Sequence, residues 1–79
     1  MKQQMILIKI RDIILPYLDE PCEIEMRTHL IQDLMINSFD YINIIADIEN
    51  EFKIQIDGFD VYHIKDLIKF IEQNHQKYE

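Results

Sequence analysis

Apolar residues recur at helical spacing in three separate segments of the chain. In the first, about residues 3–15, they fall at i, i+4, i+7, i+8 and i+11, at Ile6, Ile10, Ile13, Ile14 and Tyr17. Apolar residues at this spacing line one face of a 3.6-residue helix, so the pattern predicts an amphipathic helix. Pro16 disfavours helical geometry at the residue before it, and we therefore expect the helix to end or bend at Leu15.

The second segment, about residues 38–51, carries a broader apolar stripe, made of Phe39, Ile42, Ile45, Ala46 and Ile48 and closed by Phe52. Polar residues recur on its other side, at Asp40, Asn43, Asp47 and Asn50. Asn37 is the predicted N-cap, because its side-chain oxygen can accept a hydrogen bond from a free backbone N–H of the first turn. This segment therefore predicts the second helix of the fold.

The third segment, about residues 64–76, places one apolar stripe at Ile64, Leu67, Ile68, Ile71, His75 and Tyr78. Charged and polar residues cover the remaining positions, so a third amphipathic helix is predicted. Asp57 and Gly58 mark a turn before it, and one short helical turn is expected over 59–62.

A long connection, residues 16–37, joins the first two helices. A structureless loop of that length is uncommon in a compact domain, so apolar side chains are expected to hold its second half against the core. The candidates are Leu30, Ile31, Leu34, Met35 and Ile36, and 28–34 is expected to form a helical turn. With one Gly and two Pro in 79 residues, the chain is predicted to be a single all-α domain, a small bundle of three main helices plus one short helix.

Charge narrows the possible partners. The formal net charge is −7, and residues 12–51 hold ten acidic residues against the single base Arg27. Nucleic-acid binding depends largely on Lys and Arg neutralising phosphates, so a nucleic-acid partner is not expected. An acidic surface of this kind favours a basic protein partner.

The sequence gives little support for a catalytic site or a metal site. His29, His63 and His75 are far apart and no cysteine joins them at ligand spacing, so no metal site is predicted. No local signature joins Cys22, Ser38 and a histidine into a nucleophile–base pair. A single cysteine permits no intrachain disulfide, and neither a membrane span nor a signal peptide is expected. A cytoplasmic monomer is therefore the expectation.

Ser38 is the residue that stands out for chemistry. It opens the second predicted helix, where free N–H groups and the positive end of the helix dipole would stabilise a phosphate ester on its hydroxyl. Ser38, Ile42 and Ala46 follow at i, i+4 and i+8, so an apolar track runs away from the hydroxyl. Serine is also common at helix starts for structural reasons alone, and both interpretations stay open on position alone.

The chain resembles the acyl carrier protein family. The segment 30–45, which reads LIQDLMINSFDYINII, is similar to the family's attachment region, where Asp-Leu-Gly precedes Asp-Ser-Leu-Asp. The segment 48–52 is similar to the family's Leu-Glu-x-x-Phe, and 63–67 to the Thr-Val-x-Asp-Leu that opens its last helix. The resemblance spans essentially the whole chain.

The resemblance implies a carrier and not an enzyme. A phosphopantetheinyl transferase would move 4′-phosphopantetheine from coenzyme A onto Ser38. The acyl or aminoacyl cargo would be bound to the terminal thiol of this group as a thioester. Acyl-loading and acyl-transferring enzymes with basic docking patches would be the other partners. The residues implied to meet them are Asp40, Ile42, Asn43, Ala46, Asp47 and Glu49.

Several positions depart from the family pattern. Asn37 replaces the usual Asp, Met35 replaces the usual Gly, and residues 57–63 form a shorter stretch than is usual. The Met35 substitution predicts a different backbone path before Ser38. Together the departures suit a specialised carrier, in polyketide, peptide, lipid or cell-wall modification, rather than housekeeping fatty-acid synthesis. An unmodified interaction module on the carrier fold, or an unrelated small acidic bundle, are the alternatives.

Overall fold

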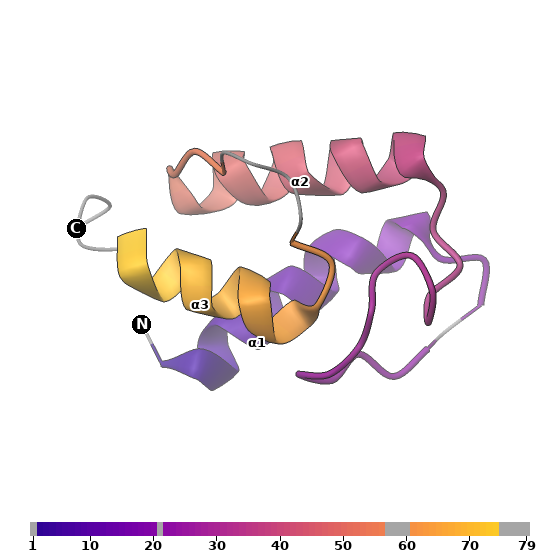
Figure 1. Ribbon diagram of the computed structural model, residues 1–79, viewed down its shortest axis with the longest axis horizontal. Helices are drawn as coiled ribbons and strands as arrows, with labels where there is room; N and C mark the ends of the chain where they lie inside the picture. The colour runs from indigo at the N-terminus through magenta and orange to yellow at the C-terminus, as the bar shows by residue number, and fades with distance from the viewer. Residues whose placement is uncertain (1, 21, 57–60, 75–79) are drawn as a thin grey trace.

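The computed structural model describes residues 2–20, 22–56 and 61–74. Within these ranges the chain forms three α-helices, α1 (Gln3–Ile14), α2 (Ser38–Phe52) and α3 (Ile64–Asn74), with a 3₁₀ turn, η1 (Leu15–Tyr17), directly after α1. α1 contacts both other helices, and Figure 1 shows α2 running above the other two. The described part of the chain contains no β-strand, which confirms the predicted all-α bundle.

α1 ends where proline requires it to. Ile14 is its last α-helical residue, and Pro16 lies in the tighter η1 turn that follows. Proline has no N–H to donate and disfavours α geometry in the residue before it, so the α-helical hydrogen-bond pattern stops here. Three residues of the predicted apolar face, Ile6, Ile10 and Ile14, are fully buried.

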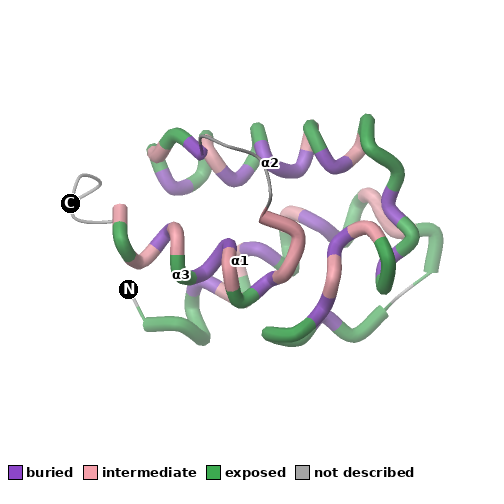
Figure 2. The backbone as a smooth tube through the Cα atoms, viewed as in Figure 1, coloured by how far each residue is buried: buried purple, intermediate pink, exposed green. Residues whose placement is uncertain are grey.

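α2 buries half of the stripe that the sequence predicted, namely Ile45, Ile48 and Phe52, and leaves the other half exposed. Its buried residues are Tyr41, Ile44, Ile45, Ile48 and Phe52. Phe39, Ile42 and Ala46, which belong to the predicted stripe, are exposed instead. Figure 2 shows the buried side of α2 turned toward the other helices and the exposed side turned away. The stripe was too wide because α2 is apolar around most of its circumference, and periodicity alone does not choose among its faces.

α3 buries the stripe that its sequence predicts. Ile64, Leu67, Ile68 and Ile71 are all fully buried. His75 and Tyr78, assigned to the same stripe, lie outside the described residues, as do 57–60. Val61 and Tyr62, the described part of the short helix expected over 59–62, are not helical.

The connection between η1 and α2 is held to the bundle by apolar side chains and by the backbone. Leu30, Leu34 and Ile36 are buried, as expected. The helical turn expected over 28–34 is a series of turns at 30–34 rather than a helix.

Backbone hydrogen bonds join this connection to the start of α3. The N–H of Leu30 donates to the Tyr62 carbonyl at 2.7 Å, and the N–H of Ile64 donates to the Thr28 carbonyl at 3.0 Å. The ring of His29 stacks on that of Tyr62, with centroids 5.5 Å apart. These pairings between residues distant in sequence order the connection that leads to Ser38.

Candidate functional site

Ser38 is exposed at the first position of α2. It is the only serine in the chain, and the only threonine, Thr28, is buried. Ser38 is therefore the one exposed aliphatic hydroxyl in the sequence. The N–H groups of the first helical turn have no acceptor within the helix, so the environment of this hydroxyl favours negative charge.

Asn37 caps α2 as the sequence predicts. Its backbone is extended, and its Oδ1 accepts a hydrogen bond from the Asp40 N–H at 2.7 Å. Its carbonyl accepts from the Tyr41 N–H at 2.9 Å, which closes the first turn. Ser38 is thus fixed on a capped, regular helix rather than on a loose loop.

The acidic residues of α2 differ in what they already bind. Asp40 is half-buried, and Asp47 is exposed and accepts a hydrogen bond from the Tyr17 hydroxyl at 2.8 Å. Glu49 is half-buried, and its Oε2 accepts from the Ile56 N–H at 2.8 Å. Glu49 and Asp47 therefore both have a partner within the chain, a backbone N–H and a side-chain hydroxyl respectively. Asp47 is nevertheless exposed, so its charge remains accessible beside α2.

The bond between Tyr17 and Asp47 ties η1 to α2. It raises the pKa of the Tyr17 hydroxyl above its usual 10.0, because the phenolate would lose the hydrogen bond to Asp47. Partial desolvation and the negative charges of Asp47 and Asp40 act in the same direction. Tyr17 is consequently a neutral donor over the whole physiological range.

An exposed apolar strip runs along α2 from Ser38. Phe39 is 73% exposed and Ile42 65%, and Ala46 continues the strip one turn further. Ile42 and Ala46 also line a groove of about 290 Å³ with Tyr41, Ile45, Glu49, Gln55 and Ile56. Asn43, half-buried, separates this strip from Asp47.

Met35 does not pack on the core as the sequence suggested. Its side chain is 85% exposed. Met35 has φ 56°, in the left-handed region that glycine favours, and a changed backbone path relative to other carriers stays a prediction. The family's usual glycine at this position was the signal that could have indicated a left-handed residue.

Within residues 2–20, 22–56 and 61–74, no three His, Cys, Asp or Glu side chains are grouped so that they could hold a metal ion. His29 and Asp33, which share i, i+4 spacing, interact through the His29 backbone N–H, which donates to the Asp33 carboxylate at 2.7 Å. The ring Nδ1 of His29 accepts from the N–H groups of Ile31 and Gln32 at 3.2 and 3.0 Å. The histidine thus has a structural function.

In the same ranges no helix has the length and apolar character needed to cross a bilayer.

The chain is similar in sequence to curated carrier proteins over most of its length. No protein-family model matches the chain. Curated relatives named acyl carrier protein, from Lactococcus lactis subsp. cremoris (strain MG1363) and Lactococcus lactis subsp. lactis (strain IL1403), are each 37% identical over 68 residues, which covers 84% of this chain and 92% of the relative. Members of this family are carriers and not enzymes. Similarity over nearly the full length of these relatives, together with the three-helix bundle, shows that the chain belongs to the acyl carrier protein family.

Proposed function

We propose that this chain carries an acyl or aminoacyl cargo as a thioester on a 4′-phosphopantetheine arm attached to Ser38. The single observation that carries the proposal is the position of Ser38, an exposed hydroxyl at the first residue of a capped helix. A phosphodiester at this point would lie beside the N–H groups and the positive dipole end of α2. The residues present therefore fit the group that the family carries.

The attachment step is a phosphoryl transfer. The Oγ of Ser38 attacks the phosphorus that bears the pantetheine unit of coenzyme A, and a new O–P bond forms. The pyrophosphate P–O bond breaks, adenosine 3′,5′-bisphosphate leaves, and the serine proton passes to a base of the transferase. The protein contributes position and charge, and the transferase contributes the catalytic groups.

The acyl-loading and acyl-transferring enzymes, and the transferase itself, are proposed to dock on the exposed side of α2. Asp40 and Asp47 would face basic patches, while Ile42, Asn43 and Ala46 would supply the less polar part of the contact. Glu49 contributes mainly by holding Ile56, through the hydrogen bond described above. Such charged contacts chiefly raise association rates and select partners, and they weaken with salt.

The departures from the family pattern support a specialised pathway within this proposal. Asn37 removes one negative charge next to Ser38, and Met35 adds an exposed apolar side chain before it. The surface that partners would approach is accordingly less charged and more apolar around the attachment point. Partner enzymes adapted to this surface would differ from those of a general fatty-acid carrier, and polyketide, peptide, lipid or cell-wall modification remain the candidate pathways.

Intact-mass measurement tests the proposal. The purified protein is incubated with coenzyme A and a broad-specificity phosphopantetheinyl transferase, and then treated with a thiol reductant. We expect an increment of one phosphopantetheine group, which Ser38→Ala abolishes and Cys22→Ala leaves intact. The reductant removes any mixed disulfide between Cys22 and coenzyme A, so the surviving increment reports a bond that thiols do not cleave.

The same experiment separates the carrier from the alternative. A folded wild-type protein that takes no increment from several transferases would overturn the carrier proposal and favour an interaction module that is never modified. Helix content measured by circular dichroism on the same samples shows whether each variant is folded. Ser38→Ala is expected to keep the wild-type spectrum, because its exposed hydroxyl makes no core contact.

A further inference from the structure

We propose that Met35 is a docking contact for the transferase that modifies Ser38, and that its side chain enters an apolar pocket with a basic rim on that enzyme. This inference rests on the proposed modification of Ser38. It goes further by assigning a role to a residue outside α2.

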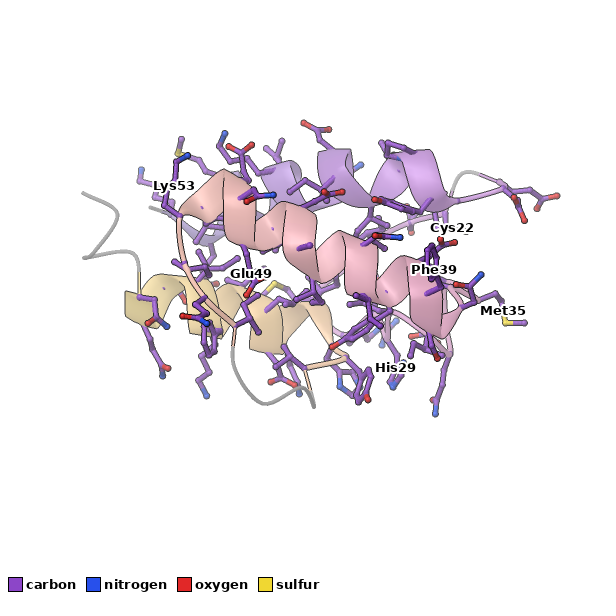
Figure 3. The ribbon with its side chains drawn as sticks, turned by 90° about the horizontal axis from the view of Figure 1, so that it is seen from above. Cys22, His29, Met35, Phe39, Glu49 and Lys53 are labelled. Atoms are coloured by element: carbon purple, nitrogen blue, oxygen red, sulfur yellow. The ribbon has the colours of Figure 1, made fainter. Side chains whose placement is uncertain are left out.

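Met35 is turned outward between two residues that are turned inward. Leu34 is 7% exposed and Ile36 4%, whereas Met35 is 85% exposed and is the most exposed large hydrophobic side chain described. A single exposed apolar residue would by itself need no explanation. Here, however, Phe39 lies at the same end of α2 with 73% exposure, and Figure 3 shows both side chains there. Two large apolar side chains thus flank the attachment serine.

The backbone at Met35 gives a second, independent indication. Among the described residues, only Met35 and Lys53 have positive φ without being glycine, and both have φ 56°. This conformation is unfavourable for a residue with a Cβ and costs glycine little. A bulky side chain kept in an unfavourable conformation three residues before the attachment serine points to a functional requirement for that side chain.

Lys53 lacks the features that single out Met35. It ends α2 in a common left-handed cap, with its N–H donating to the Glu49 carbonyl. Lys53 lies at the end of α2 opposite Met35 and Phe39 (Figure 3). It has the same φ as Met35 but is far from the attachment serine along the helix, so it provides the matched control.

The surroundings of Met35 indicate the chemistry of the partner. Met35 lines a surface hollow of about 330 Å³ together with Asp19, Glu20, Cys22 and Asp33, among others. An enzyme that brings its active site to the Ser38 hydroxyl must cover this end of α2. Its complementary surface would therefore hold an apolar pocket with Lys or Arg around it. Methionine suits such a contact because its unbranched side chain adapts to irregular pockets.

The test measures modification kinetics and stability on the same variants. The probe is a broad-specificity phosphopantetheinyl transferase with coenzyme A, and the carrier chain is the varied substrate. Met35→Gln keeps the length and the backbone cost but removes the apolar contact, and we expect KM to rise about fivefold at unchanged kcat and unchanged Tm. Met35→Gly should raise KM similarly while raising Tm by about 4–8 °C, because the backbone cost is relieved.

Lys53→Gly completes the comparison. It should raise Tm as Met35→Gly does and leave KM at the wild-type value. Wild-type KM for Met35→Gln and Met35→Gly would overturn the inference, although the mass increment on wild type would still support the proposed function. A wild-type protein that takes no increment would instead overturn the proposed function itself, and this inference with it. Failure of this inference would therefore be seen in the Met35 variants, and failure of the proposed function in the wild-type protein.

Discussion

Replacing Asn37 by alanine would remove the side-chain acceptor that closes the first turn of α2. The bond lost is the one from the Asp40 N–H to Asn37 Oδ1, which is 2.7 Å long. Loss of such a cap typically costs about 1 kcal/mol. Because Asn37 is exposed, water can reach the freed N–H, and we expect a cost near this central value rather than the upper end of about 2 kcal/mol.

The cost translates into a measurable shift in melting temperature. For a domain of this size, about 1 kcal/mol lowers Tm by roughly 4–8 °C. Asn37→Asp is the matched variant, because it keeps an acceptor at the same place and adds a negative charge near the positive end of the helix dipole. That charge contributes about 0.3–1 kcal/mol, with a gain at the low end expected because Asp40 is already in the first turn.

Thermal and urea unfolding followed by circular dichroism would measure both variants. The expected result is a lower Tm for Asn37→Ala, a Tm at or slightly above wild type for Asn37→Asp, and an unchanged urea m-value for both. An alanine variant as stable as wild type would show that the cap contributes nothing. An equal loss in both variants would show that the amide, and not an acceptor at this position, is what α2 requires.

Three further predictions concern Tyr17, Glu49 and Asp47. The pKa of Tyr17 is raised in the folded state, so the stability that its protonated hydroxyl contributes is complete below pH 10.0 and is lost as the pH rises through the folded-state pKa. Tyr17→Phe should flatten this loss of stability at alkaline pH in urea unfolding. An identical pH profile for the variant and wild type would refute the assignment. Glu49→Ala removes the acceptor of the Ile56 N–H and should cost about 1–3 kcal/mol, while Glu49→Gln keeps an acceptor and should recover most of it in the same melts; equal losses would contradict this. Asp47→Asn keeps an acceptor for the Tyr17 hydroxyl but removes the negative charge, so it should slow the modification of Ser38 severalfold at low salt. The difference from wild type should shrink at high salt. Rates equal to wild type at all salt concentrations would exclude a docking role for that charge.

Local sequence signals located the main elements well. The end of α1 followed from Pro16, since the ring constraint acts within one residue of the break. The start of α2 followed from Asn37, whose side chain reaches only the next turn. The place of Ser38 at the first residue of that helix followed in turn, whereas its exposure is known only from the structure.

Features that depend on contacts between residues distant in sequence could not be predicted from the spacing of apolar and polar residues. The buried face of α2 is centred on Ile44 and Ile48, and not on Phe39 and Ile42, because the positions of α1 and α3 decide which side is covered. The pairing of Leu30 with Tyr62 joins residues 32 positions apart, and no periodicity reports such a contact. The bond that commits Glu49 to the Ile56 N–H was missed for the same reason.

The sequence by itself determined three helices, their approximate limits, the acidic character and the serine at the start of the second helix. Each of these follows from interactions within one or two turns of the chain, where spacing and residue type are sufficient. Only the tertiary structure decided that Met35 points outward with φ 56° and that Phe39 and Ile42 stay exposed. Those outcomes depend on how separate elements pack against one another, because burial is a property of the assembled bundle and not of any one segment.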